Sequence, residues 1–309
     1  MSELPPGGDQ AASSRSAVSP GSAWWMAIRP RTLPVSIGPV LVGTAVAFVE
    51  GGVRIGPAVA AALGALLLQI GSNFANDVYD FEKGADTSDR IGPPRATQLG
   101  LLSPSAVKRG MVLVFALATA VGVYLTWVAG PAIIVIGIVS IVAAIAYTGG
   151  PWPLGYHGLG EVAVFVFFGL VAVVGTTFVQ IGSIPALAWL AALPVGFLAT
   201  TILVVNNLRD IATDERAGKR TLAVRLGRAG TRWQWLLLVL GAYAVPVLVW
   251  ASFEVEAWVL LPWLSAPLAI SLWRVISIQQ GGPALNEALA GTAKLGVLFA
   301  LLFSLGLCA

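Results

Sequence analysis

Long apolar runs dominate the pattern of hydrophobic and polar positions along the chain. Most runs are close to the ~20 residues that an α-helix needs to cross a bilayer. None shows the alternation of apolar and polar residues expected of barrel strands. We therefore predict an all-α integral membrane protein, with nine transmembrane helices in one bundle around a central cavity. The predicted spans are 33–49, 56–78, 109–129, 131–147, 160–181, 186–206, 233–251, 257–276 and 289–307.

The composition agrees with a place in the membrane. Of the 309 residues, 57% are hydrophobic and 11% are charged, against roughly 25% charged residues in a soluble domain. Cysteine and histidine occur once each, as Cys308 and His157, which excludes a disulfide framework and a metal site built from several such residues. Residues 1–23 are rich in Ser, Pro, Gly and Ala, so we expect a disordered cytoplasmic tail before a single transmembrane domain at 24–309.

Lysine and arginine are confined almost entirely to one side of the predicted membrane. With nine crossings, all but one of the 18 basic residues fall on the side of the N-terminal tail, and the exception is Arg54. Cytoplasmic loops carry an excess of basic residues, so we expect the N-terminus in the cytoplasm and the C-terminus outside, in the inner (plasma) membrane. The net charge of +3 then reflects contact with membrane lipid, and we expect no nucleic-acid partner.

Acidic side chains gather at two places, and the first is the cytoplasmic end of the second predicted helix. The polar positions there follow the i, i+3, i+4, i+7 spacing that puts residues on one helix face. They are Asn73, Asn76, Asp77 and Asp80. Several carboxylates on one face near a membrane repel one another and lose hydration, which requires compensation.

The second acidic cluster lies at the end of the sixth predicted helix and repeats the first. Asp210 and Asp214 follow Asn206 or Asn207 at helical spacing, and a basic loop comes next, as it does after the first cluster. Because helices 2 and 6 are four apart, this repetition suggests two four-helix halves in parallel, each giving one acidic stripe to the cavity. We expect the loops after helices 2 and 6 to cap the cavity on the cytoplasmic side.

These clusters favour a divalent cation bound together with a diphosphate. Oxygen ligands without His or Cys suit Mg²⁺, with Mn²⁺ as a possible substitute, and nearby Arg and Lys would complete a diphosphate site. The predicted metal ligands are Asn76, Asp80, Asp86, Asp210 and Asp214. The alternative interpretation is that these carboxylates only pair with interfacial Arg and Lys.

At these residues the chain resembles the UbiA superfamily of intramembrane aromatic prenyltransferases. Its Asn-Asp-x-x-Asp and Asp-x-x-x-Asp motifs are matched at 76–80 and 210–214. Within the superfamily, the 1,4-dihydroxy-2-naphthoate polyprenyltransferases of menaquinone biosynthesis are similar over four segments. These are 29–34, 76–86, 147–151 and 218–227. One departure from the wider superfamily is Gly84, which stands where many members carry a third carboxylate, and Asp86 follows two residues later.

The resemblance implies transfer of a polyprenyl group from polyprenyl diphosphate to an aromatic acceptor, 1,4-dihydroxy-2-naphthoate. Loss of CO₂ and diphosphate would give demethylmenaquinol. The catalytic residues implied are Asp77, Asp80, Asp210, Asp214 and Lys219. The substrate-binding residues implied are Asn73, Arg31, Arg95, Arg220 and Tyr147.

Two other functions are compatible with the acidic motifs. Prenyl transfer to another aromatic acceptor, such as 4-hydroxybenzoate or homogentisate, would use the same residues, although the segments 147–151 and 76–86 count against it. A secondary transporter is the alternative from a different class, since carboxylates in a bundle built from repeats often bind coupling ions. Carboxylates of transporters usually lie near the membrane midplane, whereas these lie at helix ends.

Overall fold

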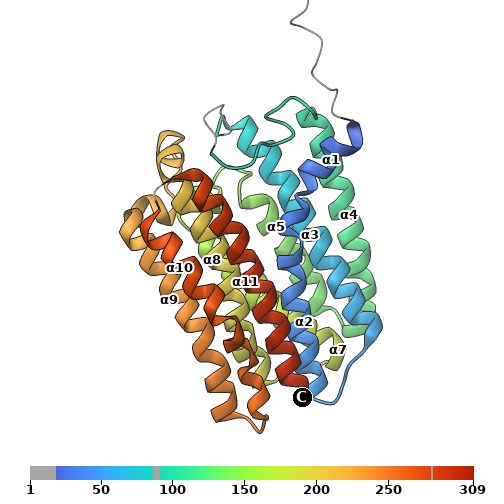
Figure 1. Cartoon of the computed structure of the whole chain (residues 1–309). Coiled ribbons are helices and arrows are strands. Elements are labelled where there is room, and N and C mark those ends of the chain that lie inside the picture. Colours follow the sequence, from blue (N-terminus) through green and yellow to red (C-terminus); the bar gives the residue numbers. More distant parts are fainter. Residues whose placement is uncertain (1–18, 86–90, 280) are drawn as a thin grey trace, which may run out of the picture.

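The computed structural model describes residues 19–85, 91–279 and 281–309, and its regular elements there are all helices (Figure 1). The helix α1 begins at Pro20, so residues 20–23, which composition assigns to the tail, form its first turn. The main helices are α1 (Pro20–Ile28), α2 (Pro34–Val49), α3 (Ile55–Glu82), α4 (Pro104–Ala129), α5 (Ala132–Ala146), α6 (Gly160–Val164), α7 (Ala172–Ile181), α8 (Ala186–Arg216), α9 (Leu222–Ser252), α10 (Ala266–Ile278) and α11 (Gly282–Cys308). Shorter helical pieces are η1 (Pro30–Thr32), η2 (Leu154–His157), η3 (Phe165–Val171) and η4 (Ala257–Ser265).

The helices confirm a multi-pass membrane protein. In the described part of the chain, seven helical stretches are long and apolar enough to cross a membrane, and α1 with α2, bent by 45°, could form an eighth. The helix α5 has 15 residues, which gives about 22 Å of length, less than the roughly 30 Å of a bilayer's hydrocarbon core. Seven to eight spans are therefore supported by length and composition, and the ninth depends on α5.

The bend between α1 and α2 is stabilised by a side chain of the first acidic cluster. Arg29 has a left-handed backbone with φ 56°, and Pro30 follows it, so the helix cannot continue. Asn73 of α3 donates hydrogen bonds to the Ile28 carbonyl at 2.8 Å and to Thr32 Oγ1 at 3.2 Å. Asn73 thereby supplies a donor to a carbonyl that the break leaves without a helical partner.

Glycines allow two helices to approach closely beside the centre of the bundle. The π-helical piece η3 continues α6 into α7, and its Gly169 faces Gly196 of α8. A Cβ atom added at Gly169 would lie 2.7 Å from the Cα of Gly196, so only glycine fits. Close packing through small residues is the usual way that helices associate in lipid.

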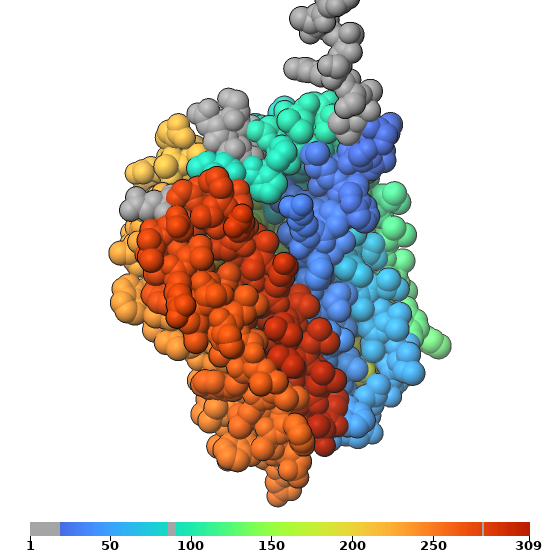
Figure 2. Space-filling view, viewed as in Figure 1, coloured from blue at the N-terminus to red at the C-terminus, as the bar shows by residue number. Residues whose placement is uncertain are grey.

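The largest buried core lies where α8, α9 and α11 pack together, around residues such as Leu198, Trp235 and Phe299. The first described residues and the C-terminus lie at opposite ends of the bundle (Figure 1). At the end where α3 and α8 finish, the segment 91–103 reaches the start of α11 (Figure 2), where Asn286 Nδ2 donates to the Ile91 carbonyl at 3.4 Å. This end of the bundle holds the polar side chains described next.

Candidate functional site

A cavity of about 2030 Å³ lies inside the bundle and receives side chains from both acidic clusters. Its polar lining includes Asn76, Asp80, Asn206, Asp210, Asp214 and Lys219. The rest of its wall is mostly apolar, with contributions from α2, α4, α5, η3 and α11. The two motifs, far apart in the sequence, thus meet at one cavity.

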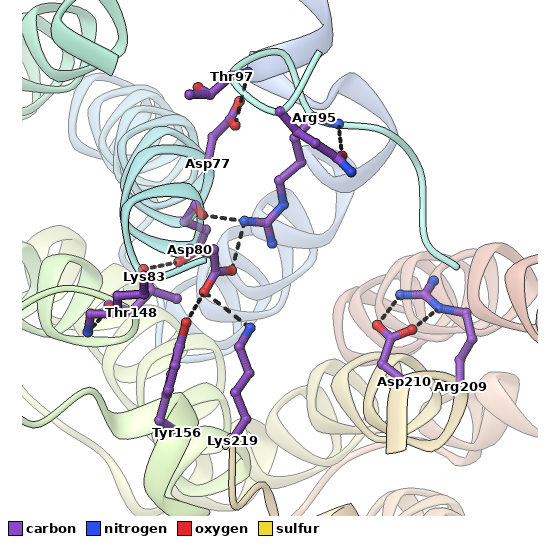
Figure 3. Close-up of polar contacts among 12 residues, drawn as sticks. Asp77, Asp80, Lys83, Arg95, Thr97, Thr148, Tyr156, Arg209, Asp210 and Lys219 are labelled. Atoms are coloured by element: carbon purple, nitrogen blue, oxygen red, sulfur yellow. Dashed lines mark hydrogen bonds and ion pairs between the residues drawn. The ribbon is translucent and has the colours of Figure 1, made fainter. Parts of the chain in front are cut away.

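Asp80 is the centre of the polar end of the cavity and is only 2% exposed. Its carboxylate forms ion pairs with Arg95 at 2.7 Å and with Lys219 at 3.1 Å (Figure 3). It also accepts a hydrogen bond of 2.7 Å from the Tyr156 hydroxyl. A buried carboxylate needs such partners, and here they come from three separate segments of the chain.

Lys219 reaches Asp80 because the chain reverses direction after α8. Gly218 has φ 71°, a conformation that glycine adopts without strain. The amide of Lys219 then donates to the Asp214 carbonyl at 2.8 Å. The turn directs the Lys219 ammonium toward α3, so the loop after the second motif supplies a cation to the first.

Tyr156 belongs to the site although sequence reasoning did not identify it. Besides its bond to Asp80, its ring contacts two ammonium groups, with Lys219 Nζ 4.7 Å and Lys83 Nζ 5.0 Å from the ring centroid. Lys83 also donates to the Thr148 carbonyl at 2.7 Å. Tyr156 lies in η2, too short a helix to show a periodic pattern, so its hydroxyl gave no signal in the sequence.

The stripe of the first motif does not face the cavity at every position. Asn76 lines it, and its side-chain oxygen accepts a 2.9 Å hydrogen bond from Thr148. Asp77 is 1% exposed, is absent from the cavity wall, and accepts a hydrogen bond of 3.3 Å from the Thr97 amide. Consecutive helix residues are rotated by about 100°, so Asp77 contacts the segment after α3 instead.

In the second motif, Asp210 is held by its neighbour Arg209. The buried guanidinium binds both carboxylate oxygens, at 2.7 and 2.5 Å, and also contacts Asn206 at 2.8 Å and Asn286 at 2.7 Å (Figure 3). A Cβ atom at Gly92 would lie 2.8 Å from this guanidinium. Arg209 thus fixes Asp210 and ties α8 to α11, whereas its sequence position suggested only a basic loop residue.

The predicted substrate-binding residues are partly brought together. Asn73, Arg31, Arg95 and Tyr147 line the cavity. Arg220 is exposed and does not line it, and its backbone amide donates to the Tyr156 carbonyl at 2.9 Å. The hydroxyl of Tyr147 is a hydrogen-bond donor at neutral pH, because an ordinary tyrosine remains protonated there.

The donor set at the cavity fits Mg²⁺. Four predicted metal ligands line it, and Asp86 lies outside the described residues. The donors are carboxylate and amide oxygens, which suit a hard cation. Within the part of the chain that the structure describes, no three His, Cys, Asp or Glu residues are grouped closely enough to hold a metal alone. A metal at either motif would complete its ligands with water or substrate phosphate, as Mg²⁺ commonly does.

Comparison with known proteins identifies the family. Residues 36–307 match the UbiA prenyltransferase family, and the chain belongs to that family. The 1,4-dihydroxy-2-naphthoate octaprenyltransferase of Escherichia coli strain K12 is 38% identical over 299 residues, which cover 94% of this chain and 96% of that protein. The 1,4-dihydroxy-2-naphthoate octaprenyltransferase of Mycobacterium tuberculosis is 40% identical over 281 residues, which cover 90% of this chain and 94% of that protein.

The fold is shared with solved structures as well. A UbiA homolog from Archaeoglobus fulgidus, solved bound to GPP and Mg²⁺, superposes with a TM-score of 0.64 at 17% identity. The likeness covers 90% of this chain and 98% of that chain. The all-helical architecture is therefore that of a known family fold.

Proposed function

We propose that this protein transfers a polyprenyl group from polyprenyl diphosphate to 1,4-dihydroxy-2-naphthoate, giving demethylmenaquinol, CO₂ and diphosphate in menaquinone biosynthesis. The observation that carries the proposal is the meeting of two acidic motifs with Lys219 and Arg95 at one cavity. The names of the curated relatives, which match nearly the whole chain, support the same acceptor.

The polar end of the cavity is suited to bind and activate a diphosphate. Bound Mg²⁺ would supply Lewis-acid neutralisation of the diphosphate, held by Asn76, Asp80, Asp210 and Asp214, and Mn²⁺ is a plausible substitute. Lys219 and Arg95 are already held there by Asp80. These two cations stabilise the negative charge that grows on the leaving diphosphate as the allylic C–O bond breaks.

The apolar wall of the cavity accommodates the isoprenoid chain and excludes water from the reacting carbon. Residues of α4 and α5 such as Val123 and Ile138 line the cavity and are 64% and 59% exposed. A long tail can therefore lie against apolar side chains of these two helices. Exclusion of water matters because water would capture the allylic cation.

The allylic cation is attacked by the ring carbon of the acceptor that bears the carboxylate. The new C–C bond uses a pair of ring electrons, and the ring carries the positive charge. Cleavage of the bond to the carboxylate releases CO₂ and returns its electron pair to the ring. Aromaticity is restored without a net change in oxidation state.

The proposed topology has nine crossings of the inner membrane. The helix α5 counts as one crossing, and the bent pair of α1 and α2 counts as another. The loops after α3 and α8 cap the site on the cytoplasmic side. The distribution of basic residues supports this topology, and so does the placement of the first described residues and the C-terminus at opposite ends of the bundle. A reporter fused at Ala309 should therefore report the outer side, whereas a fusion before Met1 should report the cytoplasm. Both reporters on the same side of the membrane would contradict the nine-helix topology.

Lys219→Ala should lower kcat by ~10²-fold, the usual cost of removing one group that stabilises transition-state charge. The KM for prenyl diphosphate should rise by a smaller factor, because the negative charge on the leaving group increases as the bond breaks. Lys219→Arg should recover part of the rate, since it keeps the charge but changes its geometry. Steady-state kinetics with labelled prenyl diphosphate would measure both constants.

The matched control for Lys219 is Lys108→Ala. Lys108 lies on the same side of the bundle but pairs with Glu82 at the surface, with side-chain exposures of 42% and 39%. This control variant should keep wild-type kinetics. If Lys219→Ala also has wild-type kinetics, Lys219 takes no part in catalysis, and its charge serves only to set the orientation of the protein in the membrane.

The acceptor is tested by incubating the purified protein with polyprenyl diphosphate, Mg²⁺ and one aromatic acceptor at a time. The panel is 1,4-dihydroxy-2-naphthoate, 4-hydroxybenzoate and homogentisate, and product mass is the readout. We expect efficient product formation with the naphthoate alone. A preference for another acceptor would replace the proposed substrate but keep the class of reaction.

A further inference from the structure

A buried polar pair at the cavity wall has no role in the proposed metal and diphosphate chemistry. Glu161 of α6 and Asn207 of α8 are 4% and 7% exposed, and Asn207 Nδ2 donates to Glu161 Oε1 at 2.9 Å. The second carboxylate oxygen, Oε2, is buried and has no hydrogen-bond partner among the described residues. Burial of a carboxylate with so few partners disfavours folding, so packing alone does not account for it.

The pair fixes the orientation of the Asn207 amide. A carboxylate only accepts hydrogen bonds, so the amide must present its NH₂ group to Glu161. The amide oxygen Oδ1 is then the atom left for other contacts, and Asn207 lines the cavity. Oδ1 can therefore accept a hydrogen bond from a ligand in the cavity.

Tyr147 adds a second polar group on the same wall. A Cβ atom added at Gly160 would lie 3.0 Å from the Tyr147 hydroxyl oxygen. Tyr147 is therefore next to the turn that carries Glu161. It lines the cavity, and its hydroxyl has no hydrogen-bond partner among the described residues. Because Tyr147 stays protonated, this hydroxyl can donate to a ligand.

We propose that Tyr147 and Asn207, the latter oriented by Glu161, form the subsite that binds the ring oxygens of a hydroxylated aromatic acceptor. The proposal rests on the proposed function, which places such an acceptor in this cavity. Asn207 Oδ1 accepts a hydrogen bond from a ring hydroxyl, and Tyr147 donates to a second oxygen of the acceptor. Glu161 acts as a positioning residue and does not touch the acceptor.

This arrangement favours the reaction as well as binding. When the ring attacks the allylic carbon, positive charge spreads onto the hydroxyl oxygen, and its O–H becomes a stronger donor. The hydrogen bond to Asn207 strengthens at that moment, which is the condition for stabilising a transition state. The charge is removed when the carboxylate leaves as CO₂ and its electron pair returns to the ring, so no proton has to pass to Glu161.

The test compares Asn207→Ala and Glu161→Gln with the wild type, measuring KM for both substrates, diphosphate release and prenylated product. We expect KM for 1,4-dihydroxy-2-naphthoate to rise about tenfold in each variant, as for one lost hydrogen bond. KM for prenyl diphosphate should stay unchanged, and more of the released diphosphate should lack a matching product. Glu161→Asp keeps the carboxyl group that accepts from Asn207 and should recover part of the affinity.

The matched control is Glu254→Gln, which changes an exposed carboxylate in the connection after α9 and should leave all constants as in the wild type. The wild-type protein provides a test that needs no variant: an acceptor with its ring hydroxyls methylated should bind about tenfold more weakly.

Three results would overturn the subsite: unchanged acceptor KM in the variants, equal increases for both substrates, or unchanged affinity for the methylated acceptor. Failure of the wild type to make any prenylated product would instead overturn the proposed function.

Discussion

Asp80→Asn is expected to lower the rate of prenyl transfer by ~10³-fold or more while the protein remains folded. The substitution removes a charge that would bind Mg²⁺ and the anchor of both Lys219 and Arg95, so it affects several groups that stabilise the leaving diphosphate. Asp210→Asn should have a similar effect from the opposite motif. Initial rates at saturating Mg²⁺ give the result, with thermal unfolding as the check on folding.

The matched control for Asp80 is Glu82→Gln. Glu82 is the last residue of the same helix, and its carboxylate is paired with Lys108 at the surface. This variant should keep wild-type turnover, because an exposed ion pair contributes little to the stability of the fold. Full activity of purified Asp80→Asn or Asp210→Asn would remove the basis for a metal site at these motifs.

Removal of divalent cations should abolish prenyl transfer completely. The donors that line the polar end of the cavity are oxygens and cationic nitrogens, so a diphosphate placed there needs a hard cation to neutralise it. Activity lost on treatment with EDTA should return on addition of Mg²⁺ or Mn²⁺. Calorimetric titration of the protein with Mg²⁺ and a non-hydrolysable prenyl diphosphate analogue would show the same requirement in binding.

The metal prediction also excludes a specific result. Zn²⁺ prefers nitrogen and sulfur ligands, and the sequence holds one His and one Cys. Zn²⁺ as the sole activating metal, or unchanged activity in EDTA, would contradict an oxygen-ligand magnesium site.

The apolar pattern predicted the helices well but marked only their membrane-embedded parts. The run 186–206 predicted a helix that the structure extends to Arg216. The run 233–251 predicted a helix that the structure begins after a kink at Gly227, where φ is 64°, with a short helical piece from Leu222 before the kink. Polar residues beyond the bilayer can continue a helix because the backbone hydrogen bonds do not depend on side-chain polarity. The extension matters here, because the polar turns of α8 carry Asp210 and Asp214.

The candidate site was predicted in part, and the limit was sequence separation. Helical spacing correctly placed Asn76 and Asp80 at the cavity, because that spacing is a local property. It could not show that Asp77 turns toward Thr97, nor that Tyr156 reaches Asp80 from a different segment. Such contacts depend on how the helices and loops pack, which the periodicity of one helix does not encode.

The central claim, decarboxylating prenyl transfer to 1,4-dihydroxy-2-naphthoate, is tested most directly by labelling the acceptor carboxylate. The purified protein would be given this acceptor with polyprenyl diphosphate and Mg²⁺, and labelled CO₂, diphosphate and prenylated product would be counted together. We predict one labelled CO₂ and one diphosphate for each product molecule, and no label in the product. A prenylated product that retains the carboxyl label, or no product from the naphthoate at all, would contradict the account.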